Sequence, residues 1–190
     1  MNYLSFVSEM RSEIYLYADD DTTVTVQCVR REQPYNADGV CGEPCDIVEV
    51  FVSFNRNPEE VEAYLSGFAG ELNYEAVQNR FSASFTAAPF NTDGIDLTLT
   101  VDGVERSVRA LSVRDNGVIS CEQALKCAME HDSELFASLT SGRNFLGEIS
   151  IRLLYDDGCY YFVGVTDRNG GTTAYLLDGG TGKVIATKKG

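Results

Sequence analysis

The sequence lacks tryptophan, has one histidine, and contains no lysine in residues 1–117. Because Ser-His-Asp and Cys-His sites need an imidazole base, such a site would have to use His131. The missing tryptophan excludes the Cys-Trp-Cys pattern of immunoglobulin domains. No apolar run approaches the ~18 residues of a membrane span. The N-terminus shows neither a basic region nor an apolar stretch of signal-peptide length. We therefore expect a cytoplasmic protein, or an extracytoplasmic one if the sequence is truncated.

Positive charge is also scarce. The chain has a net charge of −14 and a pI of about 4.4. Residues 1–117 hold 20 Asp and Glu against 8 Arg. An acidic surface repels phosphate backbones and anionic lipids. We therefore expect a protein or peptide partner and no nucleic acid or membrane. The sequence leaves the oligomeric state open.

Cysteine is the one residue type that invites a metal or disulfide interpretation. The six cysteines are Cys28, Cys41, Cys45, Cys121, Cys127 and Cys159. The Cys41-x3-Cys45 pair resembles half of a zinc knuckle, but a structural zinc site needs four ligands. A Cys41–Cys45 or Cys28–Cys41 disulfide is the second interpretation. Free thiols are the favoured one, because a chain of this size can build a core without covalent links. We expect no metal and no cofactor.

The first part of the chain reads as short strands. Residues 3–10 have helical spacing and predict a short N-terminal helix. The segments that alternate or are rich in β-branched residues are 14–17, 22–29, 47–54, 80–86, 95–101 and 104–113. Residues 58–76 fit either a helix or two strands, and we favour strands at 62–67 and 70–76. Asp102-Gly103 predicts a two-residue hairpin turn. This regular spacing of short strands predicts an all-β sandwich, immunoglobulin-like in general class, over residues 1–116.

The last part combines a helix with hairpins. Ser120 and Gln123 have the spacing of a capping box, and an apolar stripe follows as far as about His131. A second helix is expected at 133–139. Strands are expected at 145–155, 159–166 and 172–177, with a short fourth at 184–186. Residues 117–190 thus predict an α+β domain, with one or two helices packed on a three- to four-stranded antiparallel sheet.

These residues also resemble a known family. The segment Ile119-Ser120-x-Glu122-Gln123-Ala124-Leu125-x-x-Ala128 is similar to the helix opening of PepSY domains, and Leu177-Asp178-x-x-Thr181-Gly182-Lys183-Val184-Ile185 resembles that family's ending. The similarity covers about residues 118–188. It implies a small α+β unit of the kind found beside peptidases or in cell-envelope binding proteins, with no catalytic residues to transfer. Arg11 to Tyr15 add a resemblance to small uncharacterised bacterial proteins, which implies no function.

Catalytic motifs have simpler explanations. The run Gly179 to Lys183 departs from a phosphate loop, because Leu177 and Val184 stand where glycine and Ser or Thr are required. His131 fits a helix end, where a cationic imidazole is favourable. The acidic run Asp19-Asp20-Asp21 and the pair Asp156-Asp157 lack the spacing of a calcium loop and predict hairpin turns.

The rear strands hold a candidate interaction surface. It consists of Tyr155, Tyr160, Tyr161 and Tyr175. Tyrosine is frequent at protein interfaces, although these rings would equally serve to pack the sheet against the helix. Our leading hypothesis is a non-catalytic binding or protein-interaction module. An enzyme of unrecognised acid-based type is the alternative, and a peptidase regulator by analogy to PepSY modules is a second one.

Overall fold

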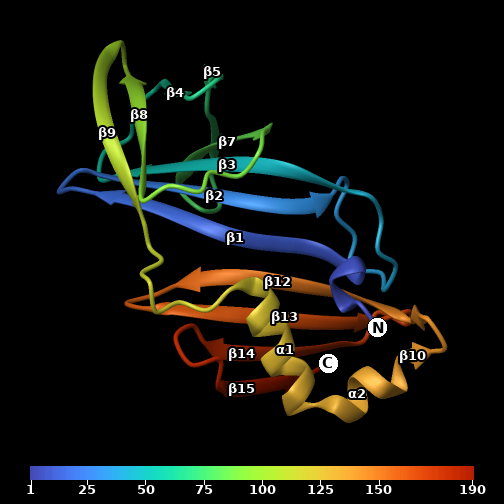
Figure 1. Ribbon diagram of the computed structural model, residues 1–190. Helices are drawn as coiled ribbons and strands as arrows, with labels where there is room; N and C mark the ends of the chain where they lie inside the picture. Colours follow the sequence, from blue (N-terminus) through green and yellow to red (C-terminus); the bar gives the residue numbers. More distant parts are fainter. The chain divides into compact units, whose positions relative to one another are not determined.

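The computed structural model describes all of residues 1–190, which fold into two compact units (Figure 1). Residues 13–28 and 46–113 form the barrel unit. Residues 1–12, 29–45 and 114–190 form the meander unit. The first three strands contribute residues to both units, so each unit is assembled from separated stretches of the chain.

The barrel unit is built from nine strands. They are β1 (Val7–Ala18), β2 (Thr22–Glu32), β3 (Pro44–Phe54), β4 (Val61–Leu65), β5 (Phe68–Glu71), β6 (Asn73–Glu75), β7 (Arg80–Thr86), β8 (Gly94–Val101) and β9 (Val104–Ser112). The hydrogen-bonded order is β5-β4-β8-β9-β1-β2-β3-β7-β6. Tyr15 of β1 pairs with Ser112 of β9, which brings the last of these strands back to the first. The result is a nearly closed antiparallel barrel.

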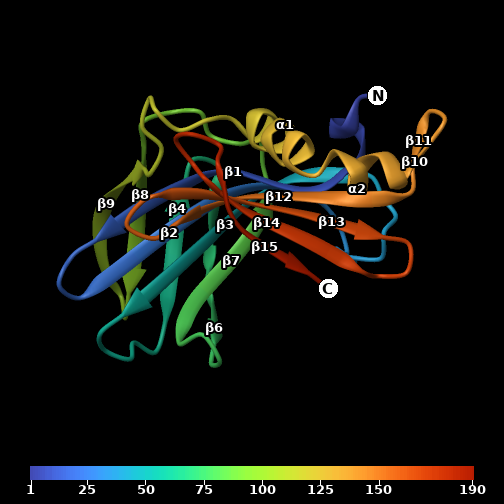
Figure 2. The ribbon, with the colours of Figure 1, turned by 90° about the horizontal axis from the view of Figure 1, so that it is seen from below.

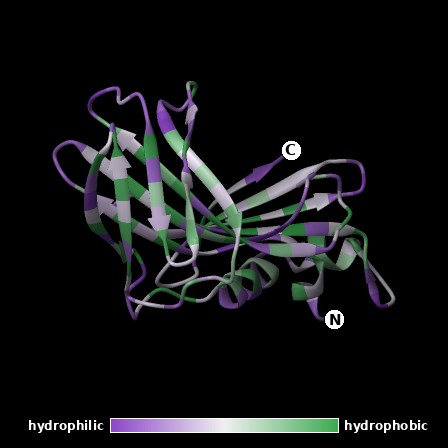
Figure 3. Ribbon diagram, turned by 90° about the horizontal axis from the view of Figure 1, so that it is seen from above, coloured by the Kyte–Doolittle hydropathy of each residue, from purple (hydrophilic) through white to green (hydrophobic).

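Alternating side chains fill the interior of the barrel. Val48, Val50 and Val52 are buried along β3, as the period of two requires of strands with one inward face. Tyr15 is also fully buried, and its hydroxyl donates to the backbone oxygen of Phe90 at 3.1 Å. Beside the open seam between β5 and β6, the rings of Phe68 and Phe85 stack at 4.2 Å. Figure 3 shows the resulting bands of apolar and polar residues along the strands.

The predicted sandwich was wrong. A sandwich needs two separate sheets, whereas one continuous path of paired strands runs around this unit. The physical reason is that alternation reports which face of a strand is buried, and both architectures bury one face. The pairing of β9 with β1 joins segments almost a hundred residues apart. No local pattern specifies that pairing.

The meander unit contains the helices and the last strands. It also includes parts of β1, β2 and β3. Its other elements are a 3-10 helix η1 (Tyr3–Phe6), α1 (Cys121–His131), α2 (Ser133–Ser138), β10 (Thr140–Ser141), β11 (Asn144–Phe145), β12 (Gly147–Tyr155), β13 (Cys159–Asp167), β14 (Thr172–Asp178) and β15 (Val184–Lys189). The strands β12 to β15 pair antiparallel in sequence order. β12 also pairs in parallel with β1, with Met10 opposite Ile151.

One face of this meander carries the helix. Figure 2 shows α1 and α2 on the same side of the strands. Cys121, Ala124, Leu125 and Ala128 are the buried residues of α1. They pack against strands whose alternate residues, such as Ile151 and Val163, have no exposed surface. Burial of this apolar stripe is what stabilises a helix of only three turns.

The α+β class predicted for residues 117–190 was also wrong. The chain is mostly β, with one substantial helix, because α2 has only six residues and the meander continues through β12 into β1. The predicted helix at 3–10 is replaced by η1 and the start of β1. Residues 58–76 contain strands and no helix, as favoured, but there are three short strands, β4, β5 and β6, in place of the two predicted at 62–67 and 70–76. None of the helices has the length and apolar character needed to cross a lipid bilayer.

Candidate functional site: an aromatic pocket in the barrel unit

A pocket of about 300 Å³ lies in the barrel unit where the β3–β4 connection meets the β6–β7 turn. It is lined by Phe54, Arg56, Asn57, Pro58, Glu59, Tyr74, Asn79 and Phe81. Ligand pockets are typically apolar and aromatic with a few polar groups, and this lining has that composition. The volume, at the low end of such pockets, suits one side chain or a small ligand.

Three aromatic rings form the apolar side of the pocket. The ring of Phe81 lies 6.0 Å from that of Phe54 and 5.2 Å from that of Tyr74, in edge and tilted arrangements. Such arrangements are favourable and fix the rings in place. Phe81 is buried, whereas Tyr74 is 54% exposed. The hydroxyl of Tyr74 donates to Oδ1 of Asn79 at 2.8 Å, which orients the exposed ring at the rim.

Asp102 holds the polar side of the pocket. Its Oδ1 accepts the backbone N–H groups of Glu59 and Glu60 at 2.8 and 3.2 Å, and its Oδ2 lies 3.0 Å from Nη1 of Arg56. These backbone donors, with a smaller effect from Arg56, lower the pKa of Asp102 below its ordinary value. Asp102 and Gly103 both have positive φ, the geometry of the predicted hairpin turn. The turn therefore also anchors the β3–β4 connection.

The electrostatics of the barrel unit are strongly one-sided. It contains 15 Asp and Glu residues but only four Arg and no Lys. Every one of these arginines lies within 3.2 Å of a carboxylate oxygen. The pairs are Arg56 with Asp102, Arg80 with Glu75, Arg106 with Asp19, and Arg109 with Asp96. The unit that contains the pocket therefore has more carboxylates than its arginines can neutralise.

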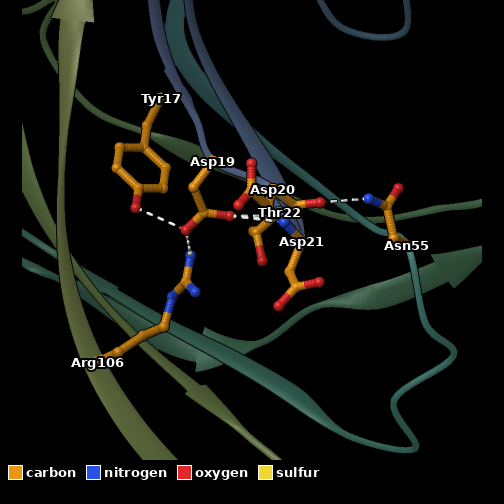
Figure 4. Close-up of polar contacts among 7 residues, drawn as sticks. All are labelled: Tyr17, Asp19, Asp20, Asp21, Thr22, Asn55 and Arg106. Atoms are coloured by element: carbon orange, nitrogen blue, oxygen red, sulfur yellow. Dashed lines mark hydrogen bonds and ion pairs between the residues drawn. The ribbon is translucent and has the colours of Figure 1, made fainter.

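The acidic turn between β1 and β2 is a different kind of site (Figure 4). Asp19 accepts hydrogen bonds from the Tyr17 hydroxyl at 2.7 Å and from the N–H groups of Asp21 and Thr22 at 3.0 and 2.8 Å. Arg106 pairs with the same carboxylate at 3.2 Å. These contacts, led by that of Tyr17, lower the pKa of Asp19. Both of its oxygens are thus engaged by the protein, so the role of this carboxylate is to stabilise the turn.

The predicted tyrosine surface is divided between two environments. Tyr161 and Tyr175 are fully buried. The hydroxyl of Tyr161 donates to the Ile119 oxygen at 2.6 Å, and that of Tyr175 donates to Oδ2 of Asp132 at 2.9 Å. Tyr155 is 46% exposed and Tyr160 is half-buried. Only the latter two have surface to offer, and an interaction through them stays a prediction.

The other candidate residues do not gather into a reactive centre. None of the six cysteines is in a disulfide, and no group of three or more His, Cys, Asp or Glu side chains is arranged to hold a metal ion. The ring of His131 lies 5.9 Å from that of Tyr175 at the end of α1. The carboxyl with a raised pKa is Glu148, which is only 1% exposed, so a substrate does not reach it.

Sequence reasoning missed the aromatic pocket. Its residues come from two separate stretches, 54–59 and 74–81, and each aromatic residue also fits an ordinary strand pattern. The available signal was an aromatic residue directly before a polar turn, as in Phe54 followed by Asn55-Arg56-Asn57-Pro58. The chain matches no protein-family model, no curated protein and no solved structure. The resemblance to PepSY domains therefore stays a prediction.

Proposed function

We propose that the protein is a non-catalytic binding module, and that its aromatic pocket receives an apolar side chain from a basic segment of a partner protein. The pocket itself carries this proposal. Its apolar wall is preformed by the packing of Phe54, Phe81 and Tyr74, so a ligand does not have to order it. Rigid aromatic residues with an exposed edge are the usual anchors of binding surfaces.

A second observation supports an apolar partner. Val77 lies in the same β6–β7 turn as Asn79 and is 93% exposed. Together with Tyr74 of β6, it places two large apolar side chains in solvent within one short hairpin. Single exposed apolar residues are common, but apolar groups beside a preformed pocket are typical of interaction sites.

The charge supports a basic partner. The four arginines of the barrel unit are already paired, and its carboxylates outnumber them by eleven. Complementary charge accelerates encounter and suppresses wrong partners more than it adds affinity. We therefore assign affinity to the pocket and selectivity to the surrounding carboxylates.

The test is peptide selection on the full-length chain. Random peptides are selected on the immobilised protein, and the winners are measured by fluorescence polarisation. We expect an aromatic or aliphatic residue flanked by Lys or Arg, with binding that weakens as salt screens the charges. Tyr74→Ala should weaken binding about tenfold or more, as truncation of an aromatic anchor does.

Tyr64→Ala is the matched control. Tyr64 is 57% exposed, lies on β4 in the same unit, and does not line the pocket. Its replacement should leave binding unchanged. Equal losses in the two variants, or a selection that enriches acidic peptides, would show that the pocket is not the binding site.

A further inference from the structure

The connection between β2 and β3, residues 33–43, is fastened to the meander unit by two carboxylates. The N–H of Gly39 donates to Oε1 of Glu148 at 3.2 Å, and the N–H of Gly42 donates to Oε2 of Glu32. Glu148 lies on β12 and Glu32 ends β2. We call residues 33–43 the clasp loop. Its seat on the strands therefore depends on acidic side chains.

The clasp loop sits very close to its surroundings. A Cβ atom at Gly39 would lie 2.3 Å from the backbone oxygen of Asp167, and one at Gly42 would lie 2.1 Å from Oε2 of Glu32. Gly39 also has a φ of +80°, which favours glycine. At Gly39, where the close atoms belong to the backbone, only a residue without a side chain allows this approach. The seated loop is therefore a defined state with specific contacts.

Glu148 is an unusual residue to place under such a loop. Its side chain is buried, and its Oε2 has no hydrogen-bond partner. Burial is the main cause of the raised pKa of this carboxyl, and the charges of Glu32 and Asp38 raise it further. The Ser8 hydroxyl and the Gly39 N–H act in the opposite direction without overcoming these effects. An ionised Glu148 is thus costly in the seated state.

No cation offsets this cost. The charged groups that act on the pKa values of Glu148, Tyr35 and Cys41 are Glu9 from β1, Glu32 from β2, Asp38 from the loop, and Arg152 from β12. Glu43 also belongs to the loop, Arg30 of β2 lines the cavity beside Gly42, and Arg168 adjoins Gly39. Arg152 is engaged by Glu9, with Nε 2.6 Å from Oε2 of that residue. The charged groups that act on the pKa of Glu148 itself are the acidic Glu32 and Asp38. A proton is therefore the group that neutralises Glu148.

The clasp loop also forms part of a cavity wall. A cavity of about 440 Å³ lies in the meander unit and is lined by Leu4, Ser5, Val7, Met10, Arg30, Cys41, Gly42 and Pro44. Cys41 and Gly42 belong to the loop, and most of the remaining lining is apolar. Release of the loop would remove this part of the wall and widen the mouth of the cavity.

We propose that the clasp loop is a proton-operated part of the wall of this cavity: protonated Glu148 keeps the loop seated, and ionised Glu148 releases it. The proposal concerns the meander unit and is independent of the aromatic pocket. Because the pKa is raised above its ordinary value of 4.5, the seated state is fully favoured below pH 4.5. The seated state loses that advantage as the pH rises through the pKa that Glu148 has when the loop is seated. Each unit by which the pKa of Glu148 in the seated state exceeds its ordinary value corresponds to about tenfold in the ratio of seated to released loop.

Amide hydrogen exchange of the full-length protein tests this directly. Exchange at Gly39 and Gly42 is followed by NMR from about pH 4 to about pH 9 and corrected for intrinsic exchange. In the wild type we expect the protection of both amides to fall about tenfold or more over this range. In Glu148→Gln the side chain is neutral at every pH, and protection should stay constant within about twofold.

Glu134→Gln is the matched control. It makes the same change at an exposed residue of α2, and it should behave like the wild type. The rate of alkylation of Cys41, located by mass spectrometry and corrected for its thiolate fraction, should rise with pH in the wild type and in Glu134→Gln, but not in Glu148→Gln. If Glu148→Gln does not fold, the wild type still tests the dependence of the loop on Glu148. The NMR signal of the Gly39 amide should then shift with pH.

Three results would overturn the proposal. The first is constant protection of Gly39 in the wild type. The second is a wild-type pH dependence that persists in Glu148→Gln. The third is an equal loss of protection at Ile149 to Leu153, since that would mean unfolding of β12 and not release of the loop.

Discussion

Asp132 shows how one carboxylate connects two elements. Its Oδ1 accepts the N–H of Leu135 at 3.1 Å and so caps α2, while its Oδ2 accepts the buried hydroxyl of Tyr175 on β14 at 2.9 Å. The Nζ of Lys189 lies 3.9 Å away. The Leu135 N–H is the main cause of the lowered pKa of Asp132. The residue therefore stabilises the start of a six-residue helix that would not persist alone.

We expect Asp132→Ala to lower the free energy of unfolding by about 2 kcal/mol, because it removes a cap and leaves a buried hydroxyl without its acceptor. Urea unfolding at neutral pH measures this. Glu134→Ala, in the same turn but exposed, should cost about 0.5 kcal/mol or less. Equal losses in both variants would contradict the role given to Asp132.

The same residue predicts a dependence on pH. Because its folded-state pKa is lowered, the contribution of Asp132 is fully present above its ordinary pKa of 3.8 and is lost as the pH falls through the folded value. The difference in unfolding free energy between wild type and Asp132→Ala should therefore shrink in acid. A difference that is constant from neutral pH into this range would show that the charge of Asp132 contributes nothing.

At the scale of elements, α1 is the part that local sequence specified best. The predicted capping box is confirmed: the Ser120 hydroxyl oxygen accepts the Gln123 N–H at 3.1 Å, and the Gln123 side chain accepts the Ser120 N–H at 2.8 Å. Most of the predicted apolar stripe is buried, including Leu125 and Ala128. Capping and helical periodicity act within a few residues, so a single sequence contains all that they require.

Packing of this helix gives a quantitative expectation. Leu125→Ala should lower the free energy of unfolding by about 3 kcal/mol, since it leaves a cavity between α1 and the meander. Lys126→Ala changes the neighbouring exposed residue and should stay within about 0.5 kcal/mol. Chemical denaturation of both variants measures the difference. A small effect of Leu125→Ala would mean that α1 does not share the core of β12 to β15.

Local patterns identified most strands and turns but not their partners. The turn at Asp102-Gly103 and the hairpins among β12, β13 and β14 join adjacent segments, and the sequence predicted them. The closure through Tyr15 and Ser112 joins distant segments, so alternation alone could not separate a barrel from a sandwich. Residues 7–10 have helical spacing but are extended, because Met10 pairs with Ile151 on a strand far along the chain.

The candidate site was still less predictable. Phe54, Tyr74 and Phe81 come together only because β3, β7 and β6 are neighbours in the sheet. Each residue alone satisfies a strand pattern. The anchoring of the β3–β4 connection by Asp102 likewise depends on tertiary structure. Pockets assembled from separate turns leave no spacing that a sequence pattern could reveal.

At the scale of the molecule, charge dominates. A net charge of −14 on 190 residues destabilises the compact state by self-repulsion. Raising NaCl from about 10 mM to about 150 mM at neutral pH should therefore raise the melting temperature by roughly 2–4 °C. Near pH 4.4, where the net charge vanishes, the same addition should have little effect. Scanning calorimetry would refute the expectation by showing an equal response at both pH values.

The parallel pairing of β1 with β12 has a consequence for biosynthesis. Residues Val7 to Arg11 leave the ribosome early, yet their partners Ile149 to Arg152 are added much later. At ~5–20 residues per second, this edge waits on the order of ten seconds without its neighbour. An unpaired, partly apolar edge is a template for association with other nascent chains. Chaperone protection is therefore most valuable for this protein before β12 has been translated.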